Sequence, residues 1–228
     1  MRAFSGGALM VAIVLALTGC DNSPPAGSQN SVLSGKTMGT VWRVTVAGVP
    51  ATRLPQLQEA ISRQLSQDDQ ELSTWKPDSA LSRFNQYRGT APWPVSEGMA
   101  DIVTMALRIG QKTDGAMDIT VGPLVNLWGF GPVAAPEHTP DPQAIESAKA
   151  LTGLQHLKVI QTSQGQALQK DLPGLYVDLS TMGEGYATDH LARLMESEGV
   201  TNYLVSAGGA LLSRGQSAGG RSRRVAIQ

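Results

Sequence analysis

The sequence contains almost no cysteine, and its opposite charges nearly cancel. Only one of its 228 residues is cysteine, so no intramolecular disulfide can form and the fold depends on packing. The 18 basic and 19 acidic residues give a formal net charge of −1, without the basic excess typical of nucleic-acid-binding proteins. The three histidines are scattered and show no metal-ligand spacing. These shortages exclude a disulfide-stabilised scaffold and argue against a nucleic-acid binder or a Cys/His metal site.

The remaining composition is that of a globular protein with many loops. Hydrophobic residues make up 41%, and 25 glycines and 13 prolines interrupt the periodic segments. Apolar periodicity predicts helices at 55–67, 79–85, 141–150 and 186–197, and another that begins at Ser96. It predicts strands at 41–46, 157–160, 175–179, 202–206 and 211–213. Helices and strands do not alternate strictly, so an α+β fold is favoured.

The N-terminus has the pattern of a secretory signal. Arg2 precedes an apolar run at 9–17, which is too short to span a bilayer. Leu17-Thr18-Gly19-Cys20 then resembles a bacterial lipobox, which predicts a signal peptide at 1–19 and lipidation of Cys20. The alternative is an ordinary cleaved peptide with an incidental cysteine. The polar stretch that follows predicts a flexible tether at 20–31, before one domain at 32–228.

Two glycine-containing segments are candidates for ligand contacts. Residues 36–40 place Met38 beside a glycine, although these residues can equally well just open a strand. Residues 113–132 mix glycine and proline with apolar walls, and Asp118 can accept hydrogen bonds from a ligand. The alternative for this second segment is a structural loop in which Asp118 caps a turn.

A third candidate, residues 177–186, passes from a predicted strand into a helix. The backbone N–H groups at such a junction favour a phosphate. Asp178 and Thr181 offer the oxygen ligands that Mg²⁺ prefers. The competing interpretation is a capping box, in which Thr181 bonds forward and Glu184 bonds back. Both roles are compatible, because a phosphate-binding helix start also needs a cap.

Taken in order, residues 35–40, 72–79, 114–131 and 176–187 resemble the motifs of the ApbE family, the FAD:protein FMN transferases. The resemblance implies an α+β fold that binds FAD and Mg²⁺. It also implies that FMN moves from FAD to a Ser or Thr hydroxyl of a target protein, with release of AMP. The expected targets are subunits of redox-driven membrane complexes such as the sodium-pumping NADH:quinone reductase.

The same resemblance implies roles for individual residues. The expected FAD contacts are Met38, Trp75, Ala116, Met117, Asp118, Asp178 and Glu184, and the expected Mg²⁺ ligand is Thr181. Trp75 takes a position that is often Tyr in the family, which keeps the stacking face and loses the phenolic hydroxyl. Asp21 after a lipidated Cys20 resembles the signal for retention in the inner membrane. The expected location is therefore the periplasmic side of the cell inner membrane.

The sequence departs from the family pattern in one respect. A segment resembling Ser-His-x-x-Asp-Pro-x-Thr-Gly, which supplies the group that assists the attacking hydroxyl and further metal ligands, does not occur here. The catalytic residues are thus expected in a missing C-terminal part, and the chain as it stands is expected to be inactive or nearly so. The alternatives to a transferase are a non-catalytic flavin-binding lipoprotein and an inactive fragment.

Overall fold

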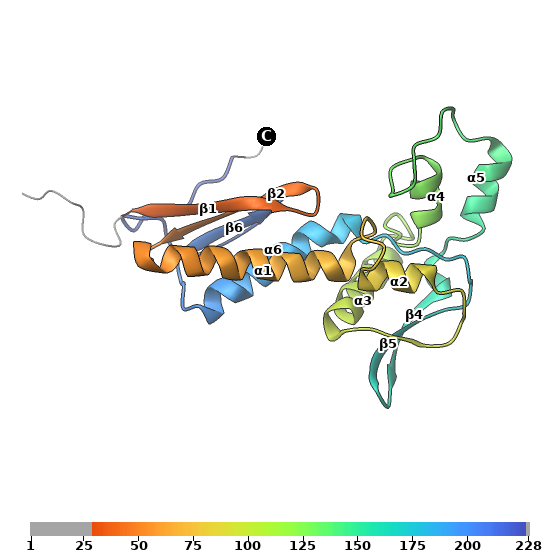
Figure 1. Cartoon of the computed structure of the whole chain (residues 1–228), viewed down its shortest axis with the longest axis horizontal. Helices are drawn as coiled ribbons and strands as arrows, with labels where there is room; N and C mark the ends of the chain where they lie inside the picture. Colours follow the sequence, from red (N-terminus) through yellow and green to blue (C-terminus); the bar gives the residue numbers. More distant parts are fainter. Residues whose placement is uncertain (1–28, 227–228) are drawn as a thin grey trace, which may run out of the picture.

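Residues 29–226 form two β-sheets at opposite ends of an elongated molecule, joined by two long helices (Figure 1). The structure is a computed structural model, and these are the residues it describes. The predicted signal peptide, Cys20 and most of the predicted tether lie outside them. Within this range no helix is long and apolar enough to cross a membrane.

The larger sheet is antiparallel throughout, with the strand order β1-β2-β6-β7. Alternate residues of β2 point into the core, and Val44 pairs directly with Val205 of β6, both fully buried. The first strand begins inside the stretch predicted as a tether, which corrects the predicted boundary at residue 31. The strands are β1 (Asn30–Thr37), β2 (Thr40–Ala47), β6 (Tyr203–Ala207) and β7 (Ala210–Arg214).

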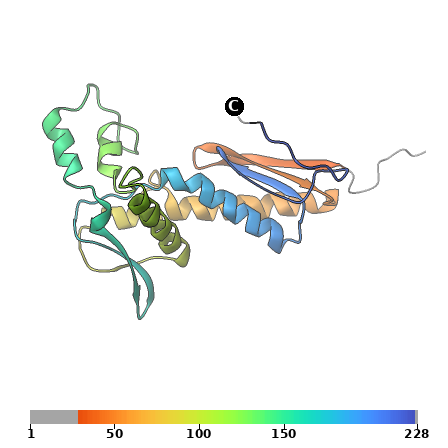
Figure 2. The same ribbon diagram turned by 180° about the vertical axis from the view of Figure 1, so that it is seen from behind.

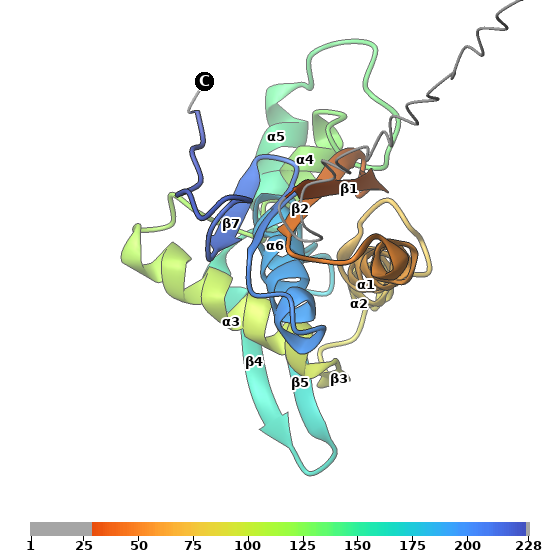
Figure 3. The same ribbon diagram turned by 90° about the vertical axis from the view of Figure 1, so that its left-hand side faces the viewer.

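Helices α1 (Leu54–Leu72) and α6 (Ser180–Ser197) lie side by side on one face of this sheet (Figure 3). Both carry an apolar stripe at helical spacing, and the two stripes bury against β2 and β6. The buried stripe residues are Leu57, Ile61 and Leu65 of α1 and Ala187, Leu191, Ala192 and Met195 of α6. Both helices are longer than the apolar periodicity predicted: α1 continues to Leu72 beyond the predicted end at 67, and α6 begins at Ser180, before the predicted start at 186. Most of the added residues are polar or glycine, so they do not extend the apolar stripe.

The other end of the molecule has its own core, around α3 (Figure 2). Its small sheet has the order β3-β5-β4, and Phe84, Met99 and Leu168 are fully buried beneath it. Ser96 and Asp141, where two helices were predicted to begin, each accept the backbone N–H three residues on and so cap α3 and α5. The elements here are α2 (Ala80–Gln86), β3 (Trp93–Pro94), α3 (Glu97–Lys112), α4 (Gly122–Leu127), α5 (Pro142–Lys149), β4 (Leu157–Thr162) and β5 (Gly165–Lys170), and short 3₁₀ helices span Ala51–Arg53 and Leu154–His156.

The strand predicted at 175–179 is wrong. This segment is buried and apolar, but it makes only an isolated parallel bridge between Tyr176 and Val121. The side-chain amide of Asn85 takes the place of a ladder partner: it donates to the carbonyl of Val177 and accepts from its N–H, both at 2.8 Å. An apolar run therefore gave the correct burial and the wrong secondary structure.

One lysine is fully buried between the small sheet and α2. Lys170 Nζ donates to the carbonyls of Phe84 and Leu175, at 3.3 and 3.1 Å, and lies 4.9 Å from the Phe84 ring centroid. Burial, with a smaller contribution from Arg88, lowers the pKa of Lys170 to about 8. The amine is thus still mainly protonated at pH 7, and it ties β5 to α2.

Candidate functional site

A cleft of about 630 Å³ opens where the two halves of the molecule meet. Three segments far apart in sequence form its walls: the β1–β2 turn, the end of α1 with the loop after it, and the start of α6. Its volume is in the range of sites for small organic ligands. The lining residues are Met38, Gly39, Asp69, Leu72, Ser73, Thr74, Trp75, Lys76, Leu179, Ser180, Gly183 and Glu184. Three of the predicted FAD contacts, Met38, Trp75 and Glu184, thus share one cleft.

Met38 reaches the cleft from a strained turn. Thr37 pairs with Thr40, so Met38 and Gly39 alone connect β1 to β2, with φ angles of 47° and 73°. This left-handed pair is what a tight hairpin requires, and it is costly for a residue with a side chain. The Met38 sulfur lies close enough to α6 that a Cβ at Gly183 would be 4.0 Å from it. The left-handed turn therefore places the polarizable, apolar side chain of Met38 close to the N-terminal end of α6.

Trp75 is held by the backbone of the loop after α1. The hydroxyl of Ser82 donates to the Ser73 carbonyl at 3.1 Å, and the Trp75 N–H donates to Ser73 Oγ at 3.1 Å. The indole itself is 64% exposed, which is unusual for so large an apolar surface. A fixed backbone and a free ring face suit stacking against a planar ligand.

Sequence reasoning missed the charged pair at this wall of the cleft. Lys76 Nζ lies 2.6 Å from Asp69 Oδ2, and both residues line the cleft. Lys76 lies within a family motif and Asp69 lies in α1, but nothing in their spacing marked them as site residues. Their position depends on where α1 ends, which the apolar stripe underestimated. The ammonium group is a candidate partner for a ligand phosphate.

The start of α6 does not contain the predicted capping box. Asp178 Oδ1 accepts the Ser180 N–H at 2.8 Å in a turn that leads into the helix. The N-cap residue is Leu179, which makes no side-chain capping bond, and Thr181 already lies in the first turn. Glu184 Oε2 accepts the N–H of Gly209, at 2.8 Å, from the β6–β7 turn. A capping box would need Thr181 to precede the helix, but α6 already begins at Ser180. Glu184 therefore does not act in a cap, and its carboxylate instead joins α6 to the large sheet.

The loop that contains Ala116, Met117 and Asp118 runs beside Asp178 and does not line the cleft. Asp118 Oδ1 accepts from both the N–H and the hydroxyl of Thr120, at 2.7 and 2.6 Å. The N–H of Asp178 donates to the Ile119 carbonyl at 2.8 Å, which aligns the two segments. For Asp118 the structure shows the turn-capping role, which was the alternative to a ligand contact.

Thr181 lines a different groove, of about 360 Å³, between α3 and α6. It is exposed there with Asp189 and His190 rather than with Met38 and Glu184. Among residues 29–226, no three His, Cys, Asp or Glu side chains form a group that can hold a metal ion.

The fold is that of the flavin transferases. The structure of the flavin transferase ApbE from Vibrio cholerae matches with a TM-score of 0.83 and 40% identity, over 87% of this chain and 63% of that one. The apo flavinyl transferase ApbE of Pseudomonas stutzeri matches with a TM-score of 0.79 and 33% identity, over 87% and 62% of the two chains. The predicted α+β class is confirmed.

A sequence model of the ApbE family matches residues 38–228, and the chain belongs to this family. The FAD:protein FMN transferase of Salmonella typhimurium is 64% identical over 224 residues, which cover 97% of this chain. The protein of that name from Escherichia coli K12 is 61% identical over 223 residues. This chain spans 64% of the length of each of these two relatives.

The contact between Glu184 and the β6–β7 turn generates a prediction. Gly208 has φ of 54°, and a Cβ there would overlap the Glu184 carboxylate. Gly208→Ala should therefore both strain the backbone and displace Glu184 from the Gly209 N–H. We expect the free energy of unfolding to fall by roughly 3 kcal/mol, as strain adds to the loss of a charge-assisted hydrogen bond.

Gly199→Ala is the matched control, because Gly199 has φ of 71° and open space where its Cβ would lie. Backbone strain alone should cost this variant about 1 kcal/mol. Urea denaturation of both variants measures the difference. Equal losses would show that the Glu184 contact adds nothing to the stability of the turn.

Proposed function

We propose that the protein is an FAD:protein FMN transferase, which moves FMN from FAD to a Ser or Thr hydroxyl of a target protein and releases AMP. The observation that carries the proposal is the cleft in which Met38, Trp75 and Glu184 meet beside the N-terminus of α6. Its support is the name that the curated relatives from Salmonella and Escherichia share. The cleft combines an exposed aromatic face with a helix start, as a flavin joined to a pyrophosphate requires.

In the proposed reaction, a target hydroxyl oxygen bonds to the phosphorus of the FMN half. The bond from that phosphorus to the bridging oxygen breaks, AMP leaves with this oxygen, and the hydroxyl proton passes to a base. Such transfers depend mainly on positioning and charge neutralisation. Trp75 and Met38 would hold the flavin, and the first turn of α6 and Lys76 would face the phosphates. Mg²⁺ is part of the proposal, with Thr181 as one ligand; this assignment comes from the family resemblance, because in this structure Thr181 lines the neighbouring groove between α3 and α6.

A non-catalytic flavin-binding protein is the second candidate. It is favoured by the composition of the cleft, because no histidine is among the described residues that line it. The two candidates share flavin binding and differ in turnover. Binding and transfer must therefore be measured separately.

Flavin binding is tested by Trp75→Ala. Loss of the aromatic contact should weaken FAD binding about three- to tenfold in a calorimetric titration. Trp128→Ala is the control, because Trp128 is also partly exposed, at 42%, but lies outside the cleft. The cleft would lose its assignment as the flavin site if both variants bound FAD as tightly as the unchanged chain.

Transfer is tested by incubating the protein with FAD, Mg²⁺ and an acceptor protein and then detecting flavin fluorescence of the acceptor on a denaturing gel. In a transfer-competent protein, Thr181→Ala should reduce Mg²⁺-dependent labelling at least about tenfold, with FAD affinity nearly unchanged, because a lost metal ligand affects the transition state more than ground-state binding. Chelation by EDTA should abolish labelling. An FAD-binding protein that labels no acceptor would favour the second candidate.

Localisation and partners belong to the same proposal. We propose that Cys20 is lipidated and anchors the protein on the periplasmic side of the inner membrane, near flavinylated subunits of redox complexes such as the sodium-pumping NADH:quinone reductase. Its support is the lipobox pattern at 17–20, which lies outside the described residues. Cys20→Ser should abolish incorporation of radiolabelled palmitate, since acylation needs the thiol. Equal labelling of both forms would contradict the anchor.

A further inference from the structure

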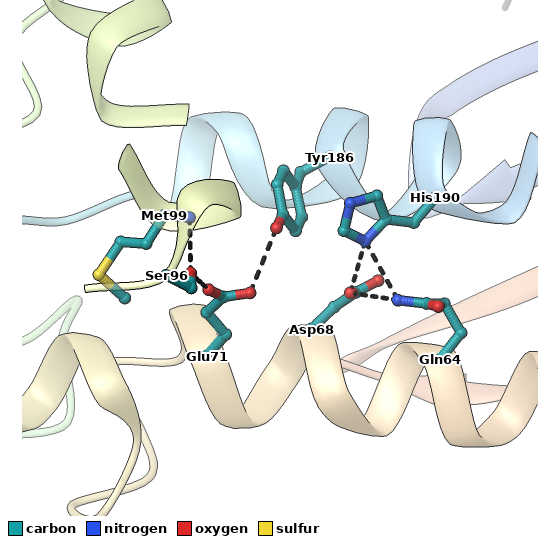
Figure 4. A network of polar contacts seen from close by, with 7 residues as sticks. All are labelled: Gln64, Asp68, Glu71, Ser96, Met99, Tyr186 and His190. Atoms are coloured by element: carbon teal, nitrogen blue, oxygen red, sulfur yellow. Dashed lines mark hydrogen bonds and ion pairs between the residues drawn. The ribbon is translucent and has the colours of Figure 1, made fainter. Parts of the chain in front are cut away.

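A polar network crosses the contact between α1 and α6 (Figure 4), at the end of α1 that also contributes Asp69 and Leu72 to the cleft. Elsewhere these helices meet through apolar side chains, so a chain of partly buried polar groups around the buried Asp68 requires an explanation at this end. None of its members lines the cleft. The network comprises Gln64, Asp68, Glu71, Ser96, Met99, Tyr186 and His190.

Glu71 joins three helices at the end nearest the cleft. Its Oε2 accepts the Tyr186 hydroxyl of α6 at 3.2 Å, and its Oε1 accepts the Ser96 hydroxyl at the start of α3. Ser96 Oγ in turn accepts the Met99 N–H at 3.0 Å. Gly98 makes this approach possible, because a Cβ there would overlap the Tyr186 hydroxyl. One carboxylate therefore fixes α1, α3 and α6 relative to one another.

Asp68 forms a second cross-link one turn earlier along α1. It is only 1% exposed, and its Oδ1 lies 2.7 Å from Nδ1 of His190 and accepts the Gln64 amide at 2.9 Å. The His190 ring also packs on Tyr186, with centroids 4.1 Å apart. The two cross-links are thus coupled side by side on the same face of α6.

The hydroxyl of Tyr186 keeps its proton and donates it to Glu71 in a hydrogen bond. Burial, followed by the negative charges of Glu71 and Asp68, raises the pKa of Tyr186 well above its usual range. The phenol therefore stays protonated and able to donate to Glu71 at neutral pH. Removing the hydroxyl would leave the Glu71 carboxylate short of a partner in a half-buried position.

The position of these cross-links relates them to the cleft. Glu71 lies between Asp69 and Leu72 of the wall that carries Trp75, and Tyr186 follows Glu184 of the opposite wall by two residues. Apolar helix contacts tolerate small slides, because many neighbouring arrangements bury similar areas. Hydrogen bonds between the two helices favour a single register of α1 against α6. If one helix slid along the other, these polar groups would lose their partners.

We propose that Asp68, Glu71, Tyr186 and His190 are positioning residues that set the separation of the two cleft walls and thereby the affinity for flavin. They do not touch the ligand and act through Trp75 and Glu184. The inference rests on the proposed function, in that the cleft is taken as the flavin site. The network keeps the cleft preformed, so that ligand binding does not have to order it.

Tyr186→Phe tests the proposal, because it deletes one hydroxyl and keeps the ring. Tyr203→Phe is the matched control: Tyr203 makes the same kind of bond, 3.1 Å to Glu196 of α6, at the end far from the cleft. Glu71→Gln is the conservative rescue, since an amide can still accept from Tyr186 and donate to Ser96. Circular dichroism and thermal melting confirm that each variant is folded at the temperature of the assay.

Hydrogen exchange gives a readout that needs no ligand. In Tyr186→Phe, the amides of residues 73–76 and 180–184 should exchange about fivefold faster or more, because the walls open locally, whereas amides of β2 and β6 keep their rates. Tyr203→Phe and Glu71→Gln should leave the rates at the walls unchanged. Unchanged walls in Tyr186→Phe, or equal acceleration in Tyr203→Phe, would overturn the proposal.

FAD titration provides the second readout. Tyr186→Phe should bind FAD about fivefold more weakly than the unchanged protein, while Glu71→Gln and Tyr203→Phe bind normally. Equal affinity in Tyr186→Phe would overturn the positioning role. If the unchanged protein binds no FAD, the proposed function fails, and the exchange rates still decide whether the network fixes the walls.

Discussion

The contact between α1 and α6 is the interaction on which the rest of the structure depends. Along the large sheet it is apolar, and Leu57, Ile61 and Leu191 bury there against β2 and β6. Toward the middle of the molecule it becomes polar, at Asp68 and Glu71. Burial of apolar area supplies the stability of the first part, whereas the second part supplies a defined register.

The cleft lies where this change occurs, and short connections rather than regular elements form its walls. The Met38 turn is strained, the Trp75 loop is pinned by serine hydroxyls, and Glu184 is held by the β6–β7 turn. The walls that carry Trp75 and Glu184 are thus fixed by a few hydrogen bonds to neighbouring segments. Such a site is preformed, and side chains such as Trp75 remain exposed for contact with a ligand. Both features suit the proposed ligand, FAD.

Local signals in the sequence predicted local structure well. The predicted helix starts at residues 79, 96 and 141 are confirmed, since Ser79, Ser96 and Asp141 each cap a helix there through a bond that needs only the three following residues. The capping box considered at Thr181 is wrong, because α6 already begins at Ser180 with Leu179 as its N-cap residue. Strands β1 and β5 were missed because they are rich in polar residues and acquire their pairing from partner strands.

The sequence by itself determined the family and the α+β class, because these depend on motifs and on periodicity along the chain. Only the tertiary structure decided that Met38, Trp75 and Glu184 share one cleft while Asp118 caps a turn and Thr181 faces another groove. It also decided that Lys170 and Asp68 are buried and that Tyr186 reaches Glu71. These facts depend on the register of α1 against α6, which is set by contacts between residues more than a hundred positions apart.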